Sequence, residues 1–339
     1  MPDDAKLDND TLMMQTLYWW GVPTLFRCPY EPDPARCDIA LVGVPHSTGN
    51  GSTERDQHLG PRAVRDVSAS GRRPHGRYML DPWKSARIAD LGDVPFPEAN
   101  NNERCIERIT AFYRRIDQAG AFPVSIGGDH SITGGILEAI AGPGARTTAG
   151  QKAVLVHFDA HTDVYEKLDH FLGAKKSAAH WASYLARNGQ IDPAHSVQIG
   201  IRGHVRTLDW LRPSYDLGYE VITMDRYEEI GHEACVSIIR DRVGDRPIYV
   251  TFDLDCLDPT VAPGVANIEP AFTGFTMSQA VRLIQSLQGF NVIGGDVACL
   301  MPTKDNPNKI TSLVASSIMF EIICLIADRL RKEGKARPQ

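Results

Sequence analysis

The chain has 339 residues, with 36 lysines and arginines against 42 aspartates and glutamates, for a formal net charge of −6 at pH 7. This mild acidity, without a long run of one sign, argues against nucleic acid or an anionic membrane as a partner. Seven scattered cysteines without a CxxC pair indicate reduced thiols, and the polar N-terminus is unlike a secretory signal. No apolar stretch comes near the roughly 20 residues that span a bilayer, so we expect a soluble, cytoplasmic protein.

Short apolar runs rich in β-branched residues alternate with amphipathic stretches along the chain. This alternation predicts parallel strands that are covered on both faces by helices. We expect one three-layer α/β/α domain over residues 36–339, with a parallel sheet of about eight strands. The expected strands are Ile39–Val44, Ala86–Asp90, Phe122–Ile126, Ala153–Phe158, Ser196–Ile201, Glu220–Thr223, Pro247–Phe252 and Asn291–Val297. The expected helices are Asn102–Gln118, Ile132–Ile140, His180–Asn188, His232–Arg242, Thr276–Leu287 and Ile310–Leu330.

Two segments depart from this alternation. Residues 1–35 carry Trp19, Trp20 and Arg27-Cys28-Pro29-Tyr30, which is too aromatic a composition for a disordered tail. We expect them to form an extension that packs on the domain or on a neighbouring subunit. The connection Tyr165–Ala179 is long, and we expect it to shape the rim of a site.

The motif Gly127-Gly-Asp-His130-Ser131 stands between an expected strand and an expected helix. Taken alone, it is compatible with a phosphate-binding glycine turn, with a tight turn capped by aspartate, or with a metal ligand. Ligands of open parallel sheets bind beyond the carboxyl ends of the strands, which is where His130 falls. His130 is therefore a candidate metal ligand.

Two acidic motifs follow at the ends of later strands. Asp159-Ala-His161-Thr-Asp163 and Asp253-Leu-Asp255 place ionisable residues two positions apart after apolar runs. Side chains at i, i+2 and i+4 of an extended strand point the same way, so we expect each set to converge. Burying four carboxylates at the end of a sheet is prohibitive unless cations neutralise them. The sequence therefore predicts a metal site, and two ions in it.

Followed by Val261-Ala-Pro-Gly264, these three motifs closely resemble the ureohydrolase superfamily, which contains arginases, agmatinases and other hydrolases of guanidino groups. The resemblance extends from about Ile39 to Leu330 and implies the arginase-like fold. It also implies a ligand set. One ion would be held by His130, Asp159, Asp163 and Asp253, and the other by Asp159, His161, Asp253 and Asp255.

Charge and ligand type agree with this implied site. Four carboxylates contribute −4 and two divalent ions contribute +4, so the buried cluster is neutral. Mixed imidazole and carboxylate ligands suit Mn²⁺ or Ni²⁺ better than Ca²⁺, and structural zinc prefers four tetrahedral nitrogen and sulfur ligands. We expect two divalent metal ions per chain, with Ni²⁺ slightly favoured and Mn²⁺ as the alternative.

The resemblance implies hydrolysis of a guanidino C–N bond to a urea and an amine. Two ions would lower the pKa of a shared water, and Asp163 is expected to carry the proton to the leaving nitrogen. His180 matches the position of a proton-shuttling histidine in relatives, and an ordinary helix histidine is the competing interpretation.

Several residues depart from the family pattern near the expected substrate. Trp181 stands where agmatinase-like relatives have glycine, and would narrow the site, stack on a planar cation or pack in the core. The loop after Gly264 also differs, and we expect its Asn267 and Glu269 to contact substrate. Cys299 replaces a guanidinium-binding glutamate, which disfavours arginase and ordinary agmatinase activity. A small buried hydrophobe is the competing interpretation for this cysteine.

These departures resemble the branch of the family that contains metformin and guanidine hydrolases. We therefore expect a small or N-substituted guanidine or biguanide, such as metformin, as substrate. One alternative is a guanidinobutyrase or agmatinase-type hydrolase of a chain-bearing guanidine, and another is an accessory subunit of a hetero-oligomeric ureohydrolase. A nucleotide-binding protein is disfavoured because GxGxxG and GxxxxGK[ST] are missing from the sequence. Relatives form trimers or hexamers, so we expect such an oligomer here, with a paralogous subunit as one option.

Overall fold

The apolar runs form one sheet of eight strands in the computed structural model, and all neighbouring strands in it are parallel. The described part of the chain comprises residues 20–51, 55–69, 74–165, 174–205, 207–269, 273–335 and 337. Across the sheet the order is β2-β1-β3-β8-β7-β4-β5-β6. The strands are β1 (Ile39–Gly43), β2 (Ile88–Asp93), β3 (Phe122–Ile126), β4 (Val154–Phe158), β5 (Val197–Ile201), β6 (Glu220–Thr223), β7 (Ile248–Asp253) and β8 (Val292–Ala298).

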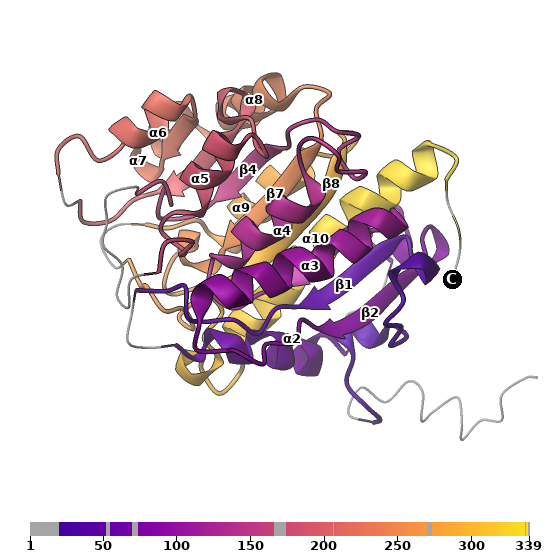
Figure 1. Cartoon of the computed structure of the whole chain (residues 1–339). Helices are drawn as coiled ribbons and strands as arrows, with labels where there is room; N and C mark the ends of the chain where they lie inside the picture. The colour runs from indigo at the N-terminus through magenta and orange to yellow at the C-terminus, as the bar shows by residue number, and fades with distance from the viewer. Residues whose placement is uncertain are drawn as a thin grey trace, which may run out of the picture.

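Helices cover both faces of the sheet, which confirms the expected three-layer α/β/α architecture. On one face α2, α7, α8, α9 and α10 pack into the larger apolar core, and on the other α3, α4, α5 and α6 build the second. Figure 1 shows α3 and α4 crossing one face of the sheet. The helices are α2 (Gly60–Ser68), α3 (Asn102–Ala119), α4 (Ile132–Ile140), α5 (Trp181–Asn188), α6 (Arg212–Leu217), α7 (Met224–Ile230), α8 (His232–Val243), α9 (Met277–Gln285) and α10 (Ile310–Lys332). Short 3₁₀ turns span Leu25–Arg27, Pro34–Arg36, Asp56–Leu59, Pro82–Lys84, Pro193–His195, Leu254–Cys256 and Pro302–Lys304.

Three helices were not expected from the sequence, namely α2, α6 and α7. Helices α2 and α6 carry a proline at the start, which reads as a breaker in a sequence but is tolerated in the first helical turn. Helix α7 follows β6 without a loop, because Thr223 caps it by accepting the backbone N–H of Arg226.

Helix α10 corrects one expectation from composition. It has 23 residues and a window of mean hydropathy 2.1, so it is long and apolar enough to cross a membrane. The expectation that no stretch approaches this length is therefore wrong. In the structure 78% of that window is buried, and the helix packs against β8, β3 and α9 as a core helix.

The segment before β1 packs against the domain where it is described. Leu25 and Phe26 are buried, and the Phe26 ring lies 6.3 Å from the rings of both Trp83 and Phe320. Trp20 is exposed, and Trp19 lies outside the described residues. The domain boundary at residue 36 and a contact with a neighbouring subunit stay predictions. Of the connection Tyr165–Ala179, only residues 165 and 174–179 are described.

The strand order decides where the sequence motifs meet. Strands β3, β8, β7 and β4 are consecutive neighbours at the centre of the sheet. Because they are parallel, the segments that follow β3, β4 and β7 leave from the same edge. These are the segments that carry the Gly127–Ser131 motif and both acidic motifs.

Candidate metal centre

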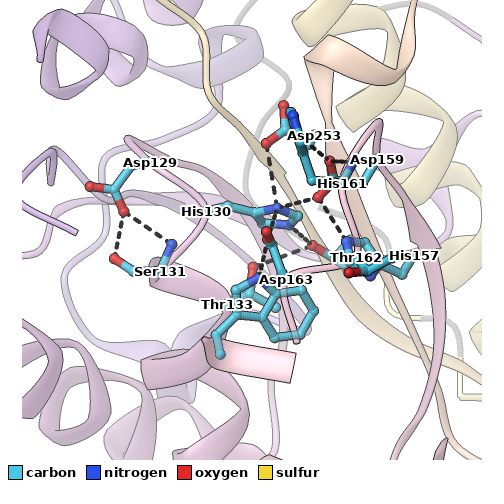
Figure 2. A network of polar contacts seen from close by, with 12 residues as sticks. Asp129, His130, Ser131, Thr133, His157, Asp159, His161, Thr162, Asp163 and Asp253 are labelled. Carbon is cyan, nitrogen blue, oxygen red and sulfur yellow. Dashed lines mark hydrogen bonds and ion pairs between the residues drawn. The ribbon is translucent and has the colours of Figure 1, made fainter. Parts of the chain in front are cut away.

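The motif after β4 is a hydrogen-bonded turn and not part of the strand. Strand β4 ends at Phe158, and Asp159 Oδ1 then accepts the backbone N–H of His161 at 2.6 Å. Asp163 has a left-handed φ of 52°. The expectation that strand alternation aligns these side chains is therefore wrong, although the turn does bring them together (Figure 2).

The motif after β7 also forms a turn. Asp253 is the last residue of the strand, and its Oδ1 accepts the backbone N–H of Asp255 at 3.0 Å. Asp255 in turn reaches across to the first acidic motif, because its Oδ1 accepts the backbone N–H of Ala160 at 3.1 Å. The two acidic motifs are thus joined directly by a hydrogen bond.

One cluster of ligands forms around His130. Its Nδ1 lies 2.9 Å from Oδ2 of Asp159, 2.9 Å from Oδ2 of Asp163 and 3.4 Å from Oδ2 of Asp253. All four side chains are buried. Figure 2 shows the three carboxylates around the imidazole ring of His130. This arrangement brings together the four residues expected to hold the first ion.

The other ring nitrogen of His130 is occupied by a buried network. His130 Nε2 lies 2.8 Å from the hydroxyl of Thr251, which itself donates to Asp296 at 2.8 Å. Asp296 also accepts hydrogen bonds from Thr133 and Tyr249. Because the Thr251 hydroxyl donates to Asp296, it accepts from His130, so Nε2 carries a proton and Nδ1 is left facing the carboxylates.

That geometry fits a cation. Among the described residues, Nδ1 of His130 makes no hydrogen bond, although it is buried and surrounded by carboxylate oxygens. A buried polar atom without a partner is costly, and a lone pair directed at anions is repelled. A proton or a metal ion between them removes both costs. Burial lowers the pKa of His130, but Asp159 and Asp163 outweigh it and raise that pKa well above its usual value.

A second cluster forms around His161 and shares Asp159 with the first. His161 Nδ1 lies 3.1 Å from Oδ2 of Asp255 and 3.4 Å from Oδ1 of Asp159. Its Nε2 lies 3.0 Å from Oε1 of Glu269. A carboxylate that accepts the outer N–H of a histidine fixes the ring with its other nitrogen toward a metal. Glu269 therefore contacts a candidate ligand, and its expected contact with substrate stays a prediction.

The carboxylates cannot all be charged without compensation. Burial, reinforced by the charges of Asp255 and Asp159, raises the pKa of Asp253 well above its usual value. Burial also raises the pKa of Asp255, partly offset by the neighbouring His161. Burial opposes the ionised form of Asp159 as well, but the neighbouring imidazoles of His130, His157 and His161 lower its pKa. The donor set and its charge thus suit two divalent ions that share Asp159.

His157 was not expected from the sequence as part of the site. It lies in β4, fully buried, with Nε2 2.9 Å from Oδ2 of Asp159. The side-chain amide of Gln198 donates to its Nδ1 at 3.3 Å, so Nε2 carries the proton and donates to the carboxylate. His157 therefore supports a ligand. A buried polar residue inside an apolar strand is the signal that could have found it, and the same is true of Asp296 in β8.

Arg202 is a second residue that the motifs do not include. Its buried guanidinium donates to the backbone carbonyls of Asp255, Cys256 and Leu257 at 2.7, 3.1 and 3.0 Å. Its own backbone N–H donates to the carbonyl of Ala160. Arg202, directly after β5, thus fixes the turn that follows β4 through its backbone and the turn that follows β7 through its side chain.

Two further candidates, Cys299 and Asn267, differ in their exposure to solvent. Cys299 follows β8, is buried with a φ of 67°, and donates its backbone N–H to Gly128. Its thiol contacts Asp253, and burial together with the charges of Asp253 and Asp255 raises the pKa of the thiol well above its usual value. It is therefore a neutral thiol beside a candidate ligand. Asn267 is exposed on the loop after β7.

His180 and Trp181 lie at the start of α5. His180 is 8% exposed, and its Nδ1 is 2.6 Å from the hydroxyl of Ser177. Trp181 is fully buried, and its indole N–H donates to Oδ2 of Asp163 at 2.7 Å. The catalytic role of His180 and the substrate contact of Trp181 stay predictions.

Comparison with known families matches residues 37–325 to the arginase family. The chain belongs to the arginase family. Among similar proteins, guanidinopropionase from Pseudomonas aeruginosa is 37% identical over 310 residues, which cover 91% of this chain and 92% of the relative. The mitochondrial guanidino acid hydrolase of Homo sapiens is 35% identical over 311 residues, or 90% of this chain and 83% of the relative. The structure of proclavaminate amidino hydrolase from Streptomyces clavuligerus matches with a TM-score of 0.83 at 29% identity, over 92% of this chain and 99% of that one.

Membership in the arginase family confirms three expectations from the sequence. The fold is arginase-like, as the match to proclavaminate amidino hydrolase shows. The protein is a hydrolase of C–N bonds in guanidino compounds. The family binds a dinuclear divalent metal site, which the cluster of His130, Asp159 and Asp163 fits, while the role of His161 as a ligand stays a prediction.

Proposed function

We propose that this arginase-family enzyme hydrolyses a chain-bearing guanidine, such as a guanidino acid, to urea and an amine. The observation that carries the proposal is the convergence of two imidazoles and three further carboxylates around a shared Asp159 at the carboxyl edge of the sheet. The guanidinopropionase and guanidino acid hydrolase relatives support the chain-bearing substrate. They support this alternative better than metformin, which the departures in the sequence favoured.

Each candidate residue of the site has a proposed role in the hydrolysis. His130, Asp159, Asp163 and Asp253 would hold one ion, and Asp159, His161, Asp253 and Asp255 the other. When bound, the two ions would lower the pKa of a shared water so that it attacks at neutral pH. Asp163 is the proposed carrier of the proton to the leaving nitrogen, because it belongs to the first cluster and is, at 6% exposed, its most accessible carboxylate. His180, which directly precedes the turn of α5 that contacts Asp163, is proposed to exchange that proton with solvent.

Hydrolysis of a small or N-substituted guanidine such as metformin is the second candidate. The observation that favours it is Cys299, which places a neutral thiol beside Asp253. A neutral group there offers no ion pair to a guanidinium. It would tolerate methyl groups on the substrate better than a carboxylate would.

We also propose that Ni²⁺ or Mn²⁺ fills the site and that the protein assembles as a trimer or hexamer in the cytoplasm. Mixed nitrogen and oxygen ligands support either metal. We propose a paralogous partner subunit as one option for the composition of that oligomer.

A substrate panel tests the proposed function. Purified protein reconstituted separately with Ni²⁺ and with Mn²⁺ is assayed for urea and amine release from guanidinopropionate, guanidinobutyrate, agmatine, guanidine, dimethylguanidine and metformin. We expect the highest kcat/KM for a chain-bearing compound. A higher kcat/KM for metformin or dimethylguanidine would establish the second candidate instead. No turnover of any compound, with two ions bound per chain, would contradict both and indicate an accessory subunit.

Cys299→Glu tests whether this position faces the substrate. A glutamate would supply a carboxylate for an unsubstituted guanidinium, so we expect the ratio of kcat/KM for guanidinopropionate over dimethylguanidine to rise at least about 10-fold. Cys299→Ser, which adds no charge, serves as the control and should leave the ratio unchanged. Metal content is measured in both variants. An unchanged ratio in a Cys299→Glu protein with two ions would show that residue 299 does not contact substrate.

A further inference from the structure

The first turn of α5 holds Asp163 at two points. The indole N–H of Trp181 donates to Oδ2 of Asp163 at 2.7 Å, and the backbone N–H of Ala182 donates to the Asp163 carbonyl at 3.2 Å. Asp163 adopts a left-handed backbone conformation that residues other than glycine rarely adopt. Such a conformation persists where surrounding contacts impose it. The start of α5 provides those contacts for both the backbone and the side chain.

The indole is itself fixed in place. It is fully buried, and its ring lies 5.0 Å from the rings of both His130 and His157. On the side of α4, a Cβ added to Gly134 would lie 3.2 Å from the Cβ of Trp181 and against the Tyr184 hydroxyl. Only glycine therefore lets α4 and α5 approach this closely. Packed in this way, the indole has no exposed face on which a substrate cation could stack.

An indole N–H is well suited to hold a ligand carboxylate. It donates one hydrogen bond, accepts none and carries no charge, so it leaves the charge of the cluster unchanged. A charged donor such as lysine would compete with the metal ions for Asp163. The N–H occupies one lone pair of Oδ2, the same oxygen that lies 2.9 Å from Nδ1 of His130. The carboxylate is thereby held with this oxygen at the first cluster.

We propose that Trp181 is a positioning residue that orients the Asp163 carboxylate for metal binding, in place of the substrate contact predicted from the sequence. It acts through Asp163 and does not touch the reacting atoms. The inference relies on the proposed function only for its consequence in turnover. Its consequence in metal binding is independent of any substrate.

Trp181→Phe keeps an aromatic ring and removes only the N–H donor. Partners that orient metal ligands typically change affinity about 10- to 100-fold when removed, and we expect a loss of that size in Mn²⁺ affinity. Calorimetric titration of the metal-free, full-length protein with Mn²⁺ measures it. The control is Trp83→Phe, which removes another buried indole donor, from Trp83 to Cys28 Sγ, in the turn before the edge strand β2 and away from the central strands that carry the ligands. That variant should bind Mn²⁺ like the wild type.

A double-mutant cycle separates positioning from general packing. In an Asp163→Ala background, Trp181→Phe should cause no further loss of Mn²⁺ affinity, because its partner is gone. An equal loss in both backgrounds, or wild-type affinity in Trp181→Phe alone, would overturn the proposal. If Trp181→Phe fails to fold, benzothienylalanine at position 181 replaces the N–H by sulfur with almost the same shape. The same loss is then expected, and wild-type affinity would again overturn the proposal.

Discussion

Asp253→Asn is expected to lower urea release at least about 100-fold and to leave the protein unable to retain two divalent ions. Asp253 stands between the two clusters, with Oδ2 3.4 Å from Nδ1 of His130 and Oδ1 bonded to the backbone of Asp255. Asparagine has nearly the same shape but removes one of the four charges that balance two ions. Metal content per chain and the rate of urea release measure the two effects.

Asp258→Asn provides the matched control for this substitution. Asp258 lies in the same segment, but its carboxylate caps a local turn by accepting the backbone N–H of Thr260 at 2.9 Å. Its replacement should leave both metal content and turnover close to wild type. Two retained ions and full turnover in Asp253→Asn would show that Asp253 is not a ligand.

Removal of metal is expected to destabilise the protein increasingly as the pH rises. Burial is the main cause that raises the pKa values of Asp253 and Asp255. At a pH above the usual aspartate pKa, the metal-free folded protein therefore binds more protons than the unfolded chain does. The pKa values of His130 and His161 are also raised, by carboxylates that outweigh burial. For all four groups, stability is present at low pH and is lost as the pH rises through the raised pKa.

The lowered pKa of Asp159 acts in the opposite direction, but at lower pH. It contributes stability above the usual aspartate pKa of 3.8, and that contribution is lost only as the pH falls below it. Above the usual aspartate pKa, Asp159 no longer opposes the four groups with raised pKa values, and these therefore decide the trend. Metal ions bind the deprotonated ligands, so the stabilisation they add grows over the same range.

Thermal unfolding with EDTA and with excess Mn²⁺ at several pH values between 5.5 and 8.5 measures this difference. At about 100 times the Kd, two ions would together add about 5 kcal/mol to the free energy of unfolding. We expect the Mn²⁺-dependent increase in Tm to be largest at pH 8.5 and smallest at pH 5.5. An increase that is constant or falls with pH would contradict the proposed ligands. Mg²⁺, which prefers oxygen ligands and keeps its waters, is the control and should shift Tm less.

The general position of the site could be predicted from the sequence because ligands of parallel sheets bind beyond the carboxyl ends of the strands. Apolar strands such as Phe122–Ile126 and Ile248–Asp253 are recognisable one at a time, and their carboxyl ends share an edge whatever the strand order. Carboxylates gathered there require cations, so the metal prediction followed from the two acidic motifs and their place after apolar strands. The predicted cause of convergence, alternation along an extended strand, was wrong, because the sequence does not show that β4 ends before Asp159.

The partners behind the ligands could not be predicted, because they depend on register between segments far apart in the chain. Thr251 meets Asp296 only because β7 and β8 pair with these two residues opposite each other. That pairing gives His130 its proton on Nε2 and directs Nδ1 at the carboxylates. A shift of one residue would place Asp296 on the other face of the sheet.

Local periodicity was enough to predict the fold class, and the resemblance of three strand-end motifs to ureohydrolases indicated the family and the six candidate ligands. Only the tertiary structure decided which groups support those ligands and how deeply each residue lies. Trp181 illustrates the difference: in the sequence it replaces a glycine of relatives, which left substrate contact and core packing both open, and packing of α5 on α4 buries it against Asp163. The local sequence determines which side chains follow each strand, whereas contacts between distant segments determine which of these side chains touch one another.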